Sequence, residues 1–128
     1  VPEIAAATGT PSEPDAANTY TAGSESPDVI TGTLSMQKQA NAGTTSSMKL
    51  TVTAKGGSRI VGLPAWLKAD KTEGHSTEAI DYTLTLDQNE KAFPTGSFPA
   101  NAVATFEIQN LSDAAKKVTV TVNVTEAP

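Results

Sequence analysis

The sequence predicts an all-β protein with an immunoglobulin-like antiparallel β-sandwich fold, and three observations support this. Apolar and polar residues alternate with a period of two in five separate stretches. The segments between these stretches are rich in Gly, Pro, Asn and Asp, the residues that favour turns. No stretch longer than one turn shows the i, i+3, i+4 spacing of an amphipathic helix.

Each of the five alternating stretches has one apolar face and one polar face, mostly threonine. In an antiparallel sheet with one wet side, the apolar face of every strand packs on the core. We expect a bulge at Gly32 in the first stretch, because a glycine inside a strand often marks one. In chain order, the predicted inward residues are Ile30, Leu34 and Met36; Met48, Leu50, Val52 and Ala54; Ile80, Tyr82, Leu84 and Leu86; Ala102, Ala104, Phe106 and Ile108; and Val118, Val120, Val122 and Val124.

The chain divides by composition into a linker and one domain. Residues 1–27 are short of large apolar side chains and rich in Pro, Ala, Ser, Thr and acids. Such a segment buries too little surface to offset its ordering entropy, so we interpret it as a linker. Residues 28–128 have the length of a single immunoglobulin-like sandwich. Because the sequence starts with Val and a linker-like segment, we expect a trimmed piece of a longer exported protein.

Charge and composition exclude several classes of partner. The net charge is −5, with nine Lys and Arg residues in all. The only basic pair, Lys116-Lys117, lies at the start of a predicted strand, where we expect it to protect an edge. Nucleic-acid binding needs a basic stripe, which is lacking, so we expect no nucleic-acid partner. No apolar run approaches the length of a membrane span, so we expect no membrane insertion by this segment. The absence of cysteine removes disulfides and thiolate chemistry. We expect a monomer without a cofactor.

The residues that could support catalysis or metal binding are isolated from one another. His75 is the only histidine and lies in the loop "TEGHST", where we expect it to be exposed. "GGSRIVG" resembles a nucleophile elbow, but Arg59 and Ile60 follow Ser58 where the second glycine should come. "DQNEKAFPTGSF" begins like a calcium loop at Asp87 but lacks its glycine and its bidentate glutamate. We therefore predict no catalytic residue, no metal site and no enzyme activity.

Aromatic residues are few, at 5% of the chain, so each is a candidate for a core or a binding role. Trp66, in "GLPAWLKAD", is either a platform for a sugar ring or a filler of the core. Strict alternation would place it on one face with Lys68 and Asp70. We expect the chain to bend after Pro64, so that Trp66 and Leu67 both turn inward.

A second aromatic group lies in "KAFPTGSFPAN", which holds two Phe-Pro pairs in one predicted loop. Phe93 and Phe98 either fold back over one end of the sandwich or stay exposed and bind a partner or a sugar. We favour the first alternative, because the two prolines stiffen the loop and lower the entropy cost of such a cap.

Taken in order, these pieces resemble the BACON domain, an immunoglobulin-like module of Bacteroidetes surface and secreted proteins. The matching run is "MKLTVTAKGG", "LPAWLKAD" with Trp66, "DYTLTLDQNE" ending near Asn89, "ATFEIQN" and "VTVTVNV", over residues 46–126. The segment "EKAFPTGSFPANAV" is longer than the family's short turn and lacks its arginine. A neighbouring family of bacterial immunoglobulin-like domains is the alternative.

The resemblance implies a non-catalytic module, often found beside glycan-degrading or glycan-binding domains. It leaves two functions open: a structural spacer or accessory domain in glycan utilisation, and direct binding of a polysaccharide or host glycan. The candidate carbohydrate-binding residues are Phe93, Phe98, Trp66 and Asn89, although the family's tryptophan generally belongs to the core. The expected partners are other domains of the same polypeptide or surface complex. The expected location is extracytoplasmic, either lipid-anchored on the outer membrane or secreted.

Overall fold

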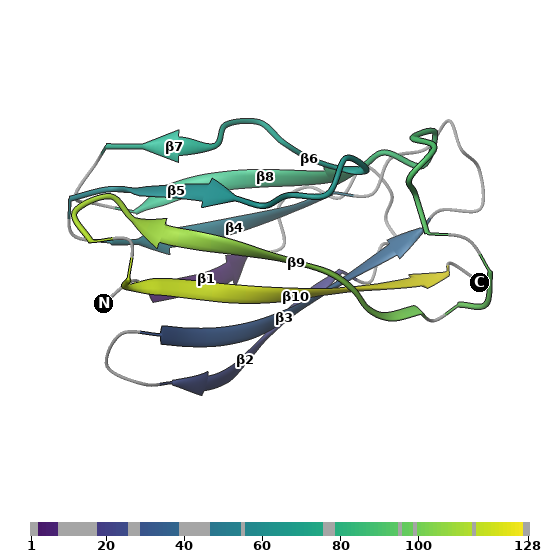
Figure 1. Cartoon of the computed structure of the whole chain (residues 1–128), viewed down its shortest axis with the longest axis horizontal. Coiled ribbons are helices and arrows are strands. Elements are labelled where there is room, and N and C mark those ends of the chain that lie inside the picture. Colours follow the sequence, from purple (N-terminus) through teal and green to yellow (C-terminus); the bar gives the residue numbers. More distant parts are fainter. Residues whose placement is uncertain are drawn as a thin grey trace.

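The structure is a computed structural model that describes residues 3–7, 18–25, 29–38, 47–54, 56–75, 79–94, 96–98, 100–113 and 115–126. In these residues the regular structure is all strand, which confirms the predicted β-sandwich (Figure 1). The strands are β1 (Glu3–Ala7), β2 (Thr19–Glu25), β3 (Val29–Lys38), β4 (Ser47–Thr53), β5 (Ser58–Val61), β6 (Leu67–Ala69), β7 (Glu73–Gly74), β8 (Ile80–Leu86), β9 (Ala100–Asn110) and β10 (Lys117–Glu126).

The strands form two sheets that enclose one core. One sheet has the order β1-β4-β8-β6, and the other has the order β2-β3-β10-β9-β5-β7. Strand pairing is antiparallel throughout, except that β3 and β10 run parallel over Val29–Lys38 and Lys117–Glu126. Six strands, β4 to β9, lie between β3 and β10 in the chain, so the connection is long enough for the two strands to run in the same direction.

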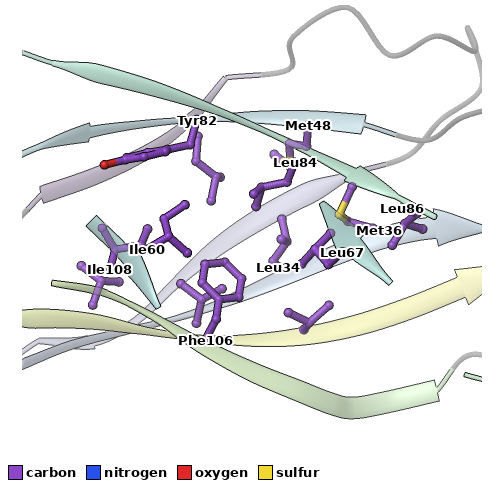
Figure 2. Close-up of a cluster of buried hydrophobic side chains, with 14 of the residues drawn as sticks. Leu34, Met36, Met48, Ile60, Leu67, Tyr82, Leu84, Leu86, Phe106 and Ile108 are labelled. Carbon is purple, nitrogen blue, oxygen red and sulfur yellow. The ribbon is translucent and has the colours of Figure 1, made fainter. Parts of the chain in front are cut away.

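Side-chain alternation decides which residues enter the core. Burial alternates along β4 from Met48 to Val52 and along β10 from Val118 to Val124, as the period of two requires. Figure 2 shows side chains from both layers meeting between the sheets, with Tyr82 on β8 and Phe106 on β9. The largest fully buried residues are Tyr82, Phe106, Leu34, Met36, Leu50, Leu67, Leu84, Ile108, Val52, Val118, Val120 and Val122.

The outer face of the six-stranded sheet carries rows of threonine. Thr21, Thr33, Thr121 and Thr105 lie opposite one another across β2, β3, β10 and β9. Cross-strand threonine pairs stabilise a sheet modestly and keep its outer face polar. The two faces of the strands therefore match the predicted division into an apolar side and a threonine side, except at Ala102, which was expected to face inward but is exposed where the β9–β10 pairing is irregular.

The prediction that residues 1–27 form a linker is wrong for two segments. β1 pairs with β4 from Glu3 to Ala7, and β2 pairs with β3 from Thr19 to Glu25. Asn18, which precedes β2, is only 5% exposed. Both segments form edge strands of the sandwich. Pairing with β4 and β3 orders these two segments, and the amino-acid composition alone does not indicate such pairing. The remaining residues of the predicted linker lie outside the described part of the chain.

Two finer expectations about the strands also need correction. Gly32 pairs in register with Val120, and the irregularity lies in β2, between Ala22 and Glu25. The missing side chain at Gly32 instead makes room for Tyr20, whose hydroxyl oxygen would lie 1.9 Å from an added Cβ. The basic pair that starts the last strand does not protect an edge, because β10 lies between β3 and β9 and Lys117 pairs with Glu107 at 3.0 Å.

The first and last strands begin and end at opposite ends of the molecule. Figure 1 shows β1 starting at the end marked N and β10 finishing at the end marked C, along the longest axis. The described residues hold no helix long and apolar enough to cross a membrane. The end at which β3 and β10 finish contains the loop between β8 and β9, and this end carries the candidate site.

Candidate functional site

A cavity of about 300 Å³ opens at the end of the sandwich where β3 and β10 finish. Lys38 and Glu126, the last residues of these two strands, lie opposite each other in the parallel register and form part of its wall. The loop after β8 supplies the rest of the lining. The complete lining is Lys38, Gln88, Glu90, Lys91, Phe93, Pro94, Gly96, Phe98 and Glu126.

Two aromatic rings close the core beneath this cavity. Trp66 is 4% exposed and Phe93 is 7% exposed, and their ring centroids lie 5.7 Å apart with an interplanar angle of 83°. This edge-to-face arrangement suits the charge distribution of aromatic rings. Trp66 lies in a turn, in which the backbone amide of Leu67 donates to the carbonyl of Pro64 at 3.1 Å. The backbone amide of Asp87 donates to the carbonyl of Trp66 at 2.7 Å. Phe93 thus presents its outer side to the cavity, whereas Trp66 belongs to the core.

A third aromatic ring, that of Phe98, is half-buried on the cavity wall. The Lys38 ammonium lies over it, with Nζ 5.3 Å from the ring centroid. A cation in this position is attracted by the electron-rich face of the ring, which orients the flexible lysine side chain. The arrangement places one positive charge and one apolar surface side by side at the cavity.

The remaining polar groups on the lining differ in how their charges are balanced. Glu90 forms an ion pair with Lys68 at 3.8 Å. Glu126 and Lys91, in contrast, have no ion-pair partner within the described part of the chain. The cavity therefore offers ammonium donors, a carboxylate acceptor and the Gln88 amide, which can both donate and accept.

The predicted carbohydrate-binding residues do not form one surface. Phe93 and Phe98 both line the cavity, while Trp66 lies under Phe93 and is buried as expected. Asn89 is exposed and outside the lining, and its backbone amide donates to Asp87 Oδ1 at 3.1 Å, which fixes the turn. A role for Trp66 as an exposed sugar platform is wrong, because its ring is enclosed by the core.

Sequence reasoning missed the charged wall of the cavity, above all Lys38 and Glu126. These residues end two strands whose sequences lie far apart, and the parallel pairing that makes them neighbours leaves no local sequence pattern. Gln88 and Lys91 fall in the turn after β8, where polar residues are common. Only the order of the strands in the sheet shows that these residues lie next to one another.

The other candidates of the sequence lie apart from the cavity. His75 is exposed and bonded to Glu73 Oε2 at 2.8 Å. Ser58 is fully buried, and its hydroxyl shares a 2.7 Å hydrogen bond with the Tyr82 hydroxyl. Across the residues that the structure describes, no group of three or more His, Asp or Glu side chains could hold a metal ion.

A bulge shapes the strand that follows the cavity loop. Ala102 has φ = 54°, a left-handed conformation that is uncommon for a residue with a side chain. Its amide donates to the side-chain oxygen of Asn123, at the point where the β9–β10 register shifts between Val122 and Val124. Bulges re-aim a strand and the loop attached to it. Here Asn123 fixes the path of the chain as it leaves the cavity.

The fold and the cavity together define a small β-sandwich module with a pocket at the end where β3 and β10 finish. No protein-family model matches the sequence, and no curated protein matches it. Among solved structures it is similar to part of a Bacteroides ovatus GH5 xyloglucanase in complex with a XXXG heptasaccharide, with 12% identity and a TM-score of 0.46. The match covers 86% of this chain and 20% of that chain, so this chain spans about a fifth of that structure's length. No functional residue is transferred from it.

Proposed function

We propose that this chain is a non-catalytic, BACON-like β-sandwich module that serves as a spacer or accessory domain in a bacterial cell-surface or secreted protein of glycan utilisation. The observation that carries the proposal is the position of the first and last strands. β1 starts at one end of the long axis and β10 finishes at the other (Figure 1). A module with this geometry holds its neighbours apart, whereas one whose ends meet would bring them together.

The separation follows from the length of the strands. β10 has ten residues, and a strand rises about 3.3 Å per residue, so the strand alone spans about 30 Å. One continuous core fills the space between the sheets along this length. A well-packed core resists deformation, which a rigid spacer requires.

A distance measurement between two spin labels tests the spacer proposal. The chain has no cysteine, so Glu3→Cys/Glu126→Cys places labels at unique positions. We expect one narrow distance distribution centred at about 30 Å or more, unchanged by added polysaccharide. The pair Lys38→Cys/Glu126→Cys, whose residues are opposite neighbours, is the short-distance control. A centre below about 20 Å, or a broad distribution, would contradict a rigid spacer.

Direct carbohydrate binding is the second candidate function, and the end cavity is the observation that favours it. The half-buried ring of Phe98 lies beside polar side chains, the combination that small-molecule sites use. Affinity electrophoresis of the native chain against a panel of soluble polysaccharides tests this candidate. Retardation that is lost in Phe98→Ala supports it, and equal migration of both proteins in every gel counts against it.

A further inference from the structure

Three charged residues of the cavity lining have no ion-pair partner in the described part of the chain. They are Lys38, which is half-buried, and the exposed Lys91 and Glu126. Lys38 and Glu126 lie opposite each other in the parallel register of β3 and β10, a position that favours opposite charges. No ion pair joins them, because the Lys38 ammonium lies over the Phe98 ring. The cavity wall thus keeps its positive and negative groups apart.

The apolar part of the lining complements these charges. The half-buried ring of Phe98 and the outer side of Phe93 form its aromatic surface, and Pro94 lies beside them. The volume of about 300 Å³ is at the lower limit for ligand pockets. A cavity of this size takes a single ring with its substituents and leaves the remainder of a chain outside.

We propose that the cavity binds one acidic sugar, a pyranose ring carrying a carboxylate, as found in polyuronate chains. This inference rests on carbohydrate binding, the second candidate function above. The ammonium groups of Lys38 and Lys91 take the ligand carboxylate through charge-assisted hydrogen bonds. The Glu126 carboxylate accepts from the sugar hydroxyls, the Gln88 amide donates and accepts, and the ring of Phe98 contacts the C–H groups of the sugar.

The preference for an acidic sugar comes from charges at the cavity and not from the net charge of the whole chain. With a net charge of −5, the protein as a whole repels a polyanion. Lys38 and Lys91 provide the local attraction, and Lys68 neutralises the nearby Glu90. Binding should therefore weaken as salt rises, because Lys91 is exposed to solvent and Lys38 is only half-buried.

Titration with a trigalacturonate and with an uncharged galactose trisaccharide tests the proposal. Calorimetry gives the affinity, and chemical-shift changes at the amides of Gln88 and Gly96 locate the site. We expect the trigalacturonate to bind at least about tenfold more tightly than the neutral trisaccharide, since a hydrogen bond to a charged group contributes ~1.5–3 kcal/mol. Lys91→Gln should lose about tenfold in affinity for the trigalacturonate, because it removes one ammonium donor.

Lys71→Gln is the matched control, because Lys71 is exposed and lies outside the cavity lining. An equal loss of affinity in this variant would overturn the proposal in favour of unspecific charge attraction. Equal binding of both trisaccharides would overturn the acidic-sugar class and leave carbohydrate binding intact. No binding of either one, nor of any polysaccharide in the panel, up to about 10 mM would overturn both, and the label distances would still test the spacer separately.

Discussion

At the scale of single residues, Asn18 joins the two sheets through its side chain. Its Nδ2 donates to the carbonyl of Ser47 on β4 at 2.8 Å, and its Oδ1 accepts from the amide of Gln37 on β3 at 2.8 Å. Both ends of a buried amide are thereby satisfied, as burial of a polar group requires. Asn18 fixes the start of β2 against both layers.

Removing this amide should destabilise the sandwich. Asn18→Ala leaves the Ser47 carbonyl and the Gln37 amide without this partner, which costs ~1–3 kcal/mol when such groups stay buried. We expect urea unfolding to show a loss of that size in the free energy of unfolding. Asn101→Ala, at an exposed position of β9, is the control and should change it by less than about 0.5 kcal/mol. Equal stability of the two variants would show that Asn18 does not join the sheets.

Burial raises the pKa of both tyrosines above the ordinary value of 10.0. For Tyr82 the hydrogen bond with Ser58 opposes this effect, and the charges of Glu73 and Asp70 add to it. A pKa raised by folding gives a stabilising contribution that is complete below the unfolded pKa and is lost as pH rises through the folded pKa.

Absorbance of the phenolate should therefore appear only above pH 10 and together with unfolding. The chain has two tyrosines, so the amplitude at 295 nm counts both. Circular dichroism on the same samples reports whether the fold is intact. Ionisation of one tyrosine at pH 10 with an unchanged fold would show that this ring is accessible to water.

Trp66 shows how far sequence reasoning reaches at this scale. Strict alternation places its ring beside Lys68 and Asp70, but β6 contains only Leu67–Ala69. Because Trp66 precedes the strand in a turn, it and Leu67 both enter the core, as predicted from the preceding proline. Asn18 could not be predicted, because its partners come from two strands that are distant in sequence.

At the scale of elements, β2 is held on β3 by a ring that fills the place of a missing side chain. Tyr20 lies against Gly32, and a Cβ added there would lie 1.9 Å from its hydroxyl oxygen and 2.3 Å from its Cζ. Among the described side chains, the Tyr20 hydroxyl is buried without a hydrogen-bond partner. The contact of β2 with β3 thus depends on shape rather than on a polar bond from this ring.

A double-mutant cycle tests this contact. Gly32→Ala should destabilise the native chain by ~1–3 kcal/mol, because the added methyl displaces the ring of Tyr20. In a Tyr20→Ala background the same substitution should be nearly neutral, since the space is empty. Unfolding free energies of the four proteins give the coupling. A coupling near zero would mean that the ring does not lie on Gly32.

Long alternating strands were predictable, and short or edge strands were not. β4, β8, β9 and β10 fall within two residues of the stretches in which apolar and polar residues alternate. β5 and β7 have four and two residues, too few to establish a period, and β7 lies within "TEGHST", which we predict from the sequence to be a loop. β1 is rich in alanine, whose small side chain produces no strong alternation of apolar and polar residues, so its pairing with β4 leaves no signal in the sequence.

At the scale of the whole molecule, β1 and β2 determine at which residues of the chain the folded sandwich begins. If residues 1–27 were a linker, the sandwich would begin at β3, and β4 would be the exposed edge of its sheet. With β1 on β4 and β2 on β3, N-terminal residues form one edge strand of each sheet. The spacer geometry depends on this arrangement, because it starts at β1.

Hydrogen exchange of the backbone amides in β1 and β2 is the most direct test of this account. NMR resolves each amide, and those of residues 3–7 that donate to β4 should exchange measurably more slowly than an unstructured chain. The paired amides of residues 19–25 should be protected as well, and β10, internal in its sheet, gives the reference for full protection. Protection of β1 is the result that the account predicts. If all β1 amides exchanged at the rate of an unstructured chain while the β10 amides stayed protected, this result would contradict the pairing of β1 with β4 and its place in the sandwich.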